Sequence, residues 1–306
     1  MAKRHPRFKI QKGGTSSTSN ANERLARLEA KAEQLRKDIV VTTEHIGYSH
    51  TRGGFSMVEM AVALYYDFLN WSPEKVDDPD RDRFILSKGH CGHVLYNILV
   101  DKGLYTKEEL WSEYNQVGGR FGMHPNFHCL KGIEASTGSL GHGLSLSAGY
   151  ALSARMDKRD YWVVCMTGDG EMDEGSNWEA LMTGAQYGLG NLVLIVDKNQ
   201  FQIGGTTTEI KSLEPLDKRL ESFGWDVINI ENGNDMAQVL AALDKLPKPD
   251  SQTRRRPIAI ISNTLKGIGM IPGVAGTAGS HIFMVPNEDM ERAMFQSIEA
   301  LRKEQA

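Results

Sequence analysis

One carboxylate and one amide stand where they could together hold a divalent cation. Thr167-Gly168-Asp169-Gly170-Glu171 directly follows one apolar run, and Asp197-Lys198-Asn199 directly follows the next. Asp169 and Asn199 lie 30 residues apart, the length of one strand–helix–strand unit. Because parallel sheets bind ligands at the carboxyl ends of their strands, this spacing brings both side chains to neighbouring strand ends. Carboxylate and amide oxygens are hard ligands of the kind that Mg²⁺ binds in proteins.

The glycines on either side of Asp169 suit the same chemistry. Gly168 and Gly170 have no side chain, so the backbone there can approach an anion such as a diphosphate closely. Taken alone, Gly-Asp-Gly is equally well explained as a tight turn without a ligand. The matching position of Asn199 favours a metal and diphosphate site over that interpretation.

Four of the nine histidines lie in glycine-rich segments rather than on predicted helix faces: His50, His90, His124 and His142. A neutral imidazole donates from one nitrogen and accepts at the other near neutral pH, which suits contacts to hydroxyl groups and phosphate oxygens. The alternative for each is a histidine that is hydrogen-bonded only to a loop backbone. The segment around each histidine favours one of these two interpretations.

The elements that must position these residues alternate along the second half of the chain. Strands are predicted at 83–86, 161–166, 192–196, 225–230 and 258–261, and helices at 143–154, 177–187 and 236–246. Earlier helices are predicted from residue 22, over 57–68, and after Thr106. Helix starts are indicated by Ser56 with Glu59, Thr106 with Glu109, Ser176 with Glu179, and Asp235 with Gln238. Continuous apolar strands separated by helices predict an α/β fold, a doubly wound parallel sheet with helices on both faces.

Length and composition place limits on the class of protein. The 306 residues with 40% apolar content suffice for one large α/β domain. Residues 1–21 are basic and then polar, so we expect a disordered tail followed by a single domain over 22–306. The net charge of −4 suggests neither nucleic acid nor a membrane surface as a partner. No apolar run approaches the ~20 residues of a membrane span, and three cysteines without CxxC spacing are typical of a cytoplasmic protein.

The pattern of Gly-Asp-Gly with Asn some thirty residues later resembles the thiamine-diphosphate fingerprint. From about residue 35 to about residue 270 the chain resembles the amino-terminal, diphosphate-binding part of transketolases. Further segments carry the likeness: Asp80-Arg81-Asp82-Arg83-Phe84, Ser87-Lys88-Gly89-His90, Met123-His124-Pro125-Asn126, Gly138-Ser139-Leu140-Gly141-His142-Gly143 and, more loosely, the loop that starts at His50. The resemblance implies thiamine diphosphate and Mg²⁺ (or Ca²⁺ or Mn²⁺) as cofactors.

The same resemblance implies a role for each matching residue. Metal ligands would be Asp169, Asn199 and the backbone carbonyl of Phe201. Cofactor contacts would come from His90, Gly138, Leu140, Gly170 and Asn199, with Glu174 at the family's acidic position between subunits. His50 and His124 would face the substrate. The last family histidine would be His281, although its setting is unfamiliar; the loop after Lys266-Gly267-Ile268-Gly269 could instead be rearranged, which would change the donor substrate.

In this family the glutamate that activates the cofactor and the aromatic platform beneath it belong to a pyrimidine-binding domain, and no segment before Ala306 resembles one. We therefore expect a split transketolase, in which this chain and a separate pyrimidine-domain subunit form an α2β2 assembly. Its reaction would transfer a two-carbon ketol unit from a ketose or ketose phosphate to an aldose. Two alternatives stay open: a 2-oxo acid donor on the same scaffold, and a non-catalytic scaffold subunit. A nicotinamide-binding protein is disfavoured because no Gly-x-Gly-x-x-Gly follows the first strand.

Overall fold

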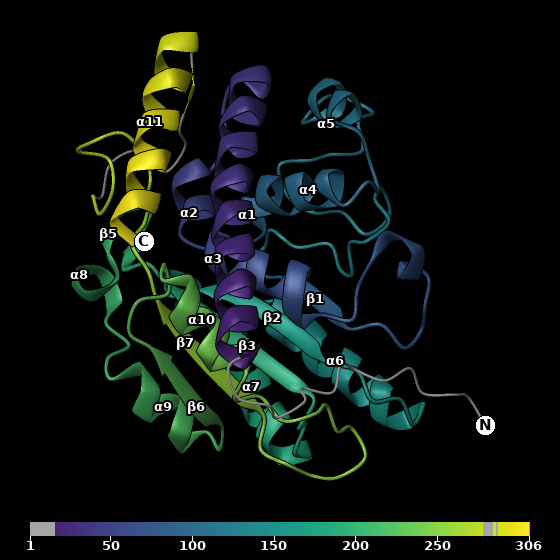
Figure 1. The fold of residues 1–306 in the computed structure, drawn as a ribbon. Helices are drawn as coiled ribbons and strands as arrows, with labels where there is room; N and C mark the ends of the chain where they lie inside the picture. The colour runs from purple at the N-terminus through teal and green to yellow at the C-terminus, as the bar shows by residue number, and fades with distance from the viewer. Residues whose placement is uncertain (1–15, 278–283, 286, 306) are drawn as a thin grey trace.

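A five-stranded sheet forms the centre of the structure, a computed structural model that describes residues 16–277, 284–285 and 287–305 (Figure 1). Its strands run in the order β1 (Arg83–Leu86), β2 (Val163–Gly168), β3 (Leu192–Lys198), β7 (Ile258–Asn263) and β6 (Asp226–Ile230), and every neighbouring pair is parallel. A small antiparallel hairpin of β4 (Phe201–Gln202) and β5 (Gly205–Thr206) follows β3. All five predicted strands are confirmed, with ends that differ by at most a few residues.

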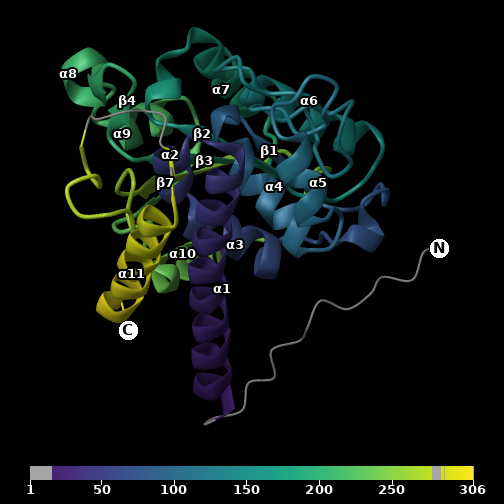
Figure 2. The same cartoon turned by 90° about the horizontal axis from the view of Figure 1, so that it is seen from above.

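Helices cover both faces of the sheet, as Figure 2 shows from above. One face packs against α1 (Ser16–Ile46), α3 (Val58–Ala63), α4 (Gly92–Asp101) and α10 (Met236–Leu243). The other packs against α6 (Gly143–Met156), α7 (Gly175–Tyr187) and α9 (Leu216–Ser222). Within β1, Phe84 and Leu86 join the first core and Ile85 the second, because successive strand residues point to opposite faces. The predicted doubly wound sheet is confirmed.

Three short helices complete the fold. They are α2 (Thr51–Phe55), α5 (Lys107–Glu113) and α8 (Thr207–Lys211). The predicted helix over 57–68 is present as α3 followed by a π-helical segment over Leu64–Phe68. None of the described helices combines the length and apolar character needed to cross a bilayer.

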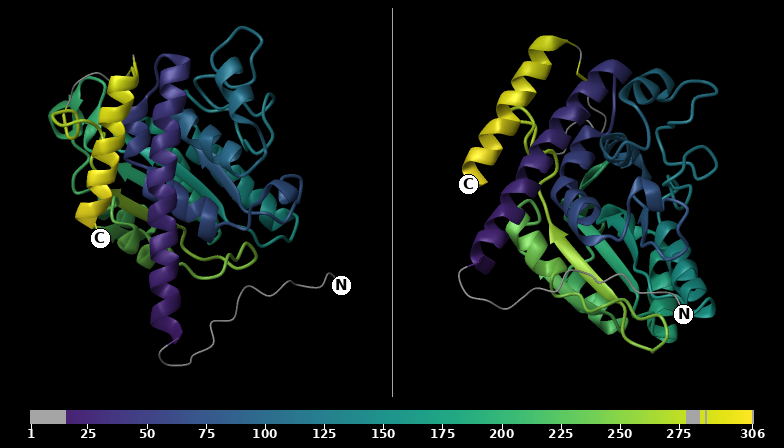
Figure 3. Two further views of the ribbon diagram at one scale, coloured as in Figure 1. Left: turned by 45° about the horizontal axis from the view of Figure 1, so that its top comes forward. Right: turned by 45° about the vertical axis from the view of Figure 1, so that its right-hand side comes forward.

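The long first helix lies beside the last one, although the two are far apart in sequence (Figure 3). α1 buries an apolar stripe that includes Leu28 and Leu35, as the spacing predicts. Lys37 Nζ contacts Glu299 Oε1 at 2.7 Å and ties α1 to α11 (Glu288–Gln305). The helix begins at Ser16, inside the segment 1–21 assigned to a tail from sequence, while residues 1–15 lie outside the described residues.

Two of the four predicted helix caps are confirmed. Thr106 and Glu109 form a reciprocal capping box at α5, and the Asp235 side chain accepts hydrogen bonds from the backbone of Ala237 and Gln238 at α10. Each satisfies backbone N–H groups that the first turn of a helix leaves without a partner.

At the other two predicted starts the helices α3 and α7 are present, but the serine caps expected there are wrong, because tertiary contacts use the side chains instead. The Ser56 hydroxyl, with one proton to donate, lies 3.0 Å from Gly53 O and 2.7 Å from Asp197 Oδ2, and α3 begins after Met57 without a side-chain cap. Glu59 forms a buried ion pair with Arg36, at 2.6 Å between Arg36 Nη1 and Glu59 Oε1.

At α7, Ser176 Oγ donates to Gly141 O at 2.9 Å, which joins the helix start to a neighbouring loop. The residue at the N-cap position is Glu174, whose side chain makes no capping hydrogen bond.

Candidate active site

The carboxyl ends of β2 and β3 lie side by side and bring the predicted metal-binding pair to one edge of the sheet. The strand register pairs Gly168 with Asp197. Asp169 and Asn199 follow directly, and each is only 6% exposed. Gln200 N donates to Asp169 Oδ2 at 2.8 Å and so links the two strand ends. The structure therefore confirms that the two residues come from adjacent strand ends.

The Asp169 carboxylate lies in a setting that disfavours its charged form. Burial, and then the negative charge of Asp197, raise the pKa of Asp169 to about 6, against the opposing effect of N–H groups from Gln200 and Gly170. A cation beside this carboxylate would offset the cost of burying its charge. The residues present thus fit a bound divalent cation.

The remaining ligands of such a cation come from oxygens other than carboxylates. In the described part of the chain, no three or more His, Cys, Asp and Glu side chains gather where they could hold a metal ion. The predicted set contains a single carboxylate, with the Asn199 amide and the Phe201 carbonyl beside it. Mg²⁺ accepts such sets, since it is commonly held by one or two carboxylates together with water and substrate phosphates.

Glu171, which the sequence analysis did not single out, joins three loops of the site. Its Oε1 accepts from Ser87 Oγ at 2.5 Å and from Gly141 N at 3.0 Å, and its Oε2 accepts from Gly168 N at 3.1 Å. Burial raises the pKa of the Glu171 carboxyl group, opposed by these donors. The only feature of the sequence that could have indicated a role for Glu171 is its place in the Gly-Asp-Gly-Glu segment.

The glycines of these loops leave no room for side chains. A Cβ on Gly170 would lie 2.8 Å from Gln202 Cβ, and one on Gly89 would lie 2.7 Å from Gly138 N. Gly138 has a φ of +135°, and a Cβ there would meet the His124 ring at 2.7 Å. The segments of His90, Gly138 and His124 are therefore in direct contact, as a shared cofactor site requires.

Two further predicted residues lie at the edge of this cluster. Leu140 is partly buried, and Glu174 is exposed at the start of α7. A Cβ on Gly141 would lie 2.6 Å from Glu174 Cβ, so Glu174 borders the Gly138–Gly143 loop. An exposed carboxylate here is compatible with a position between subunits.

Two of the predicted histidines meet through their rings. The ring centroids of His50 and His90 are 5.3 Å apart, with an angle of 64° between the planes. Burial, followed by the nearby charges of His124 and Lys266, lowers the pKa of His50 to about 4. His50 is therefore neutral at physiological pH and can act as donor or acceptor. Burial also lowers the pKa of His124, although its side chain is more exposed.

Lys266 is a further site residue whose role the sequence analysis missed. It is 2% exposed, and burial, then the charges of Arg52 and Lys88, lower its pKa to about 8. Its Nζ lies 5.9 Å from the centre of the Phe201 ring, which places it beside the metal-binding segment. An anion bound here would stabilise the positive charges of Lys266 and Lys88. The Lys-Gly-Ile-Gly segment was noted only as a landmark for His281, which lies outside the described residues.

His93 was also missed because it lies inside α4, one helical turn from the predicted loop. It is 1% exposed, and a Cβ on Gly54 would lie 2.6 Å from its Nε2. Burial, with smaller effects of His50 and Lys88, lowers the pKa of His93 to about 3.

This burial predicts acid sensitivity. The folded-state pKa values of His50 and His93 lie below the unfolded value of about 6.5, so below that pH the unfolded state binds more protons. The free energy of unfolding should therefore fall as the pH drops from 7 towards 4, and be unaffected by these groups above 7. His93→Gln should show a smaller fall between pH 7.5 and 5.0 in urea unfolding. His128→Gln, at an exposed ring, is the control; a fall equal to wild type in His93→Gln would contradict the assignment.

The chain is similar to known proteins over most of its length. A family model described as "Transketolase, thiamine diphosphate binding domain" matches residues 28–296. The chain is 39% identical over 276 residues to one of the subunits of apulose-4-phosphate transketolase from Phocaeicola vulgatus, covering 90% of this chain and 95% of that one. It is 36% identical over 248 residues to 6-deoxy-6-sulfo-D-fructose transketolase subunit SqwG of a Clostridium species, covering 81% and 88%.

Solved structures agree in fold. Transketolase from Campylobacter jejuni matches with a TM-score of 0.79 at 24% sequence identity. The match covers 91% of this chain and 45% of that one, so the chain spans less than half the length of this solved relative.

Proposed function

The chain belongs to the transketolase family, and from this premise we propose that it is the diphosphate-binding subunit of a two-component ketol transferase. The reaction is transfer of a two-carbon ketol unit from a ketose to an aldose. The observation that carries the proposal is the meeting of Asp169 and Asn199 at adjacent strand ends, with the loops of His90 and Gly138 packed beside them.

The residues of this chain bind and orient the cofactor. Thiamine diphosphate supplies, when bound, the nucleophilic carbon that carries the two-carbon unit. Asp169, Asn199 and the Phe201 carbonyl would hold Mg²⁺, which would offset the negative charge of the diphosphate. His90 donates to diphosphate oxygens, and the Gly138 and Gly170 segments let the backbone approach the cofactor. Lys266 adds a buried positive charge that stabilises the diphosphate anion.

The substrate side is formed by His50 and His124. The His50 ring lies against His90, and the His124 ring lies against Gly138, whose backbone meets the His90 loop at Gly89. Lowered pKa values keep both rings neutral. A neutral ring can donate to a sugar oxygen in one step and accept a proton in another. We propose that these rings hold the hydroxyl and carbonyl oxygens of the ketose.

Substitutions should separate the histidines into two groups. His50→Ala and His124→Ala are expected to lower kcat/KM for the sugar by roughly 10²-fold each, because a hydrogen bond to a charged transition state is worth about 2–3 kcal/mol. His90→Ala should mainly weaken binding of thiamine diphosphate. Steady-state kinetics and calorimetry on the reconstituted complex measure the two effects. His128→Ala, on the same loop as His124, is the matched control; equal losses of cofactor affinity in all three variants would refute the division.

A second polypeptide is the other part of the proposal. Relatives that this chain covers almost completely are themselves named as one subunit of a transketolase, not as the whole enzyme. Large apolar side chains stand exposed on the adjacent helices α6 and α7, where Leu146 is 41% and Met182 54% exposed, and Ile203 is 76% exposed at the hairpin tip. Such surfaces suit burial against another chain. We propose a pyrimidine-domain partner and an α2β2 assembly.

The donor is best sought among phosphorylated or sulfonated ketoses. Two relatives are named for apulose 4-phosphate and 6-deoxy-6-sulfo-D-fructose, which both carry an anionic group. Ketol transfer should be assayed with the chain and its partner on such ketoses, on xylulose 5-phosphate, and on hydroxypyruvate and pyruvate. Turnover with 2-oxo acids but no ketose would replace the proposal by the 2-oxo acid alternative. A cytoplasmic location is also proposed, in keeping with the free thiols of Cys91, Cys129 and Cys165.

A further inference from the structure

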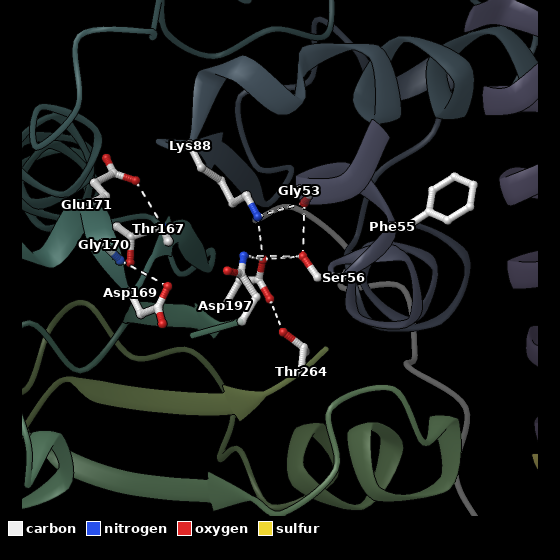
Figure 4. A network of polar contacts seen from close by, with 12 residues as sticks. Gly53, Phe55, Ser56, Lys88, Thr167, Asp169, Gly170, Glu171, Asp197 and Thr264 are labelled. Carbon is white, nitrogen blue, oxygen red and sulfur yellow. Dashed lines mark hydrogen bonds and ion pairs between the residues drawn. The ribbon is translucent and has the colours of Figure 1, made fainter. Parts of the chain in front are cut away.

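Two carboxylates stand next to each other at the ends of β2 and β3, and they differ in what they contact. Asp169 accepts from backbone N–H groups, Gly170 N at 3.0 Å and Gln200 N at 2.8 Å, with the Thr207 hydroxyl further away at 3.4 Å. Asp197 is 1% exposed and is surrounded by side-chain donors (Figure 4). Only the first carboxylate therefore has accepting capacity left for a cation.

The donors to Asp197 come from four separate segments. Its Oδ2 accepts from Ser56 Oγ at 2.7 Å, from Asn199 Nδ2 at 3.2 Å and from the ammonium group of Lys88. Its Oδ1 accepts from Thr264 Oγ1 at 2.5 Å. A carboxylate has about four acceptor sites, so this one is saturated. Lys88, itself 1% exposed, also neutralises its charge.

These contacts hold the Asn199 amide in one orientation. Asn199 Nδ2 donates to Asp197, and on the other side Asn199 Oδ1 accepts from Phe201 N at 3.2 Å. Turning the amide over would set its oxygen against the Asp197 carboxylate and its NH₂ group against the Phe201 N–H. Both new contacts would be repulsive, because one sets two acceptors against each other and the other sets two donors against each other. The amide oxygen consequently stays on the side of Phe201, whose own carbonyl belongs to the proposed metal site.

We infer that Asp197 is a positioning residue that presents the Asn199 amide oxygen to the metal, and that it thereby favours Mg²⁺ over Ca²⁺. The inference rests on the proposed function, since it requires a metal at Asp169 and Asn199. Mg²⁺ demands near-ideal octahedral geometry, whereas Ca²⁺ accepts irregular sets of oxygen ligands at longer distances. A disordered amide should penalise Mg²⁺ binding more than Ca²⁺ binding.

Two double variants isolate the orienting hydrogen bond from the buried charges. Lys88→Met/Asp197→Leu removes both charges and the acceptor, while Lys88→Met/Asp197→Asn removes both charges and keeps an amide oxygen that can accept from Asn199. Neither variant leaves a lone buried charge, which would strongly destabilise the fold. Thermal melting checks that both complexes are folded. Mg²⁺ or Ca²⁺ is then titrated into the metal-stripped complex with its partner at fixed thiamine diphosphate, and binding is followed by tryptophan fluorescence and calorimetry.

The Asn-containing double variant should bind Mg²⁺ with nearly wild-type affinity. The Leu-containing variant should bind it roughly 10–100-fold more weakly, the usual effect of losing a partner that orients a metal ligand, and its Ca²⁺ affinity should fall less. Equal Mg²⁺ affinities in the two variants would overturn the inference but leave the proposed function intact. Equal losses of Mg²⁺ and Ca²⁺ affinity in the Leu-containing variant would do the same. Wild-type protein without metal-dependent binding of thiamine diphosphate would overturn the proposed function and this inference together.

Discussion

The purified chain is expected to show no ketol transfer until the partner chain is added. The resemblance to transketolases implies that a glutamate and an aromatic platform of a pyrimidine-binding domain activate the cofactor, whereas this chain matches the family's thiamine diphosphate binding domain. The buried acidic residues at the strand ends are already engaged. Glu171 is held by three loops, Asp197 is saturated by donors, and Asp169 is the proposed metal ligand. None of these three carboxylates can take the role of that glutamate.

The measurement is a ketol-transfer assay of the chain alone, of the partner alone and of both together. Activity should appear only in the mixture, a change of several orders of magnitude, because on the two-component proposal each chain supplies part of the catalytic groups. The isolated chain should also self-associate in size-exclusion chromatography, since its exposed apolar side chains lack their cover. Addition of the partner to the Asp169→Ala variant controls for activity in the partner preparation. Robust turnover by a homogeneous preparation without a second polypeptide would refute the two-component proposal.

The second large effect is expected for Asp169→Ala, which should abolish metal-dependent binding of thiamine diphosphate. Asp169 is the single carboxylate in the proposed ligand set, so its loss removes the only full negative charge offered to the cation. The fold should survive. Burial already disfavours the charged form of this residue, and alanine leaves the backbone N–H of Gln200 without its acceptor, which costs only about 1–3 kcal/mol.

Calorimetry on the reconstituted complex, with and without Mg²⁺, tests this prediction. Asp169→Asn keeps the shape and a hydrogen-bond acceptor but lacks the charge, and it should fail to bind in the same way. Asp173→Ala, in the turn Gly170–Asp173 that follows, is the matched control and should bind normally. Wild-type cofactor affinity in both Asp169 variants would rule out the metal assignment.

The outcomes of the two capping predictions at Ser56 and Ser176 show where local sequence patterns stop being informative. Each serine stands three residues before a glutamate at a predicted helix start, and Thr106 stands at the same distance before Glu109. Only the exposed pair at Thr106 forms a cap. Ser56 and Ser176 are drawn into contacts with Asp197 and Gly141, since in a packed site a hydroxyl donates to whichever acceptor the surrounding chain brings near.

The sequence by itself determined the five strands, the helices α6, α7 and α10 between them, and the pairing of Asp169 with Asn199. Strands buried on both faces must be continuous apolar runs, and residues that follow two successive parallel strands must emerge at the same edge of the sheet. Both properties depend only on one strand or on two successive strands, so the order of residues along the chain is enough to predict them.

Only the tertiary structure decided the strand order, in which β7 lies between β3 and β6, and the contacts that depend on it. Thr264 reaches Asp197 because β7 is the neighbour of β3. Lys88 and Asp197 are 109 residues apart, and neither His93 nor Lys266 lies in a segment whose pattern indicated a role. Such contacts depend on how distant loops pack over the sheet, and that packing is determined by the burial and hydrogen bonding of the whole chain at once.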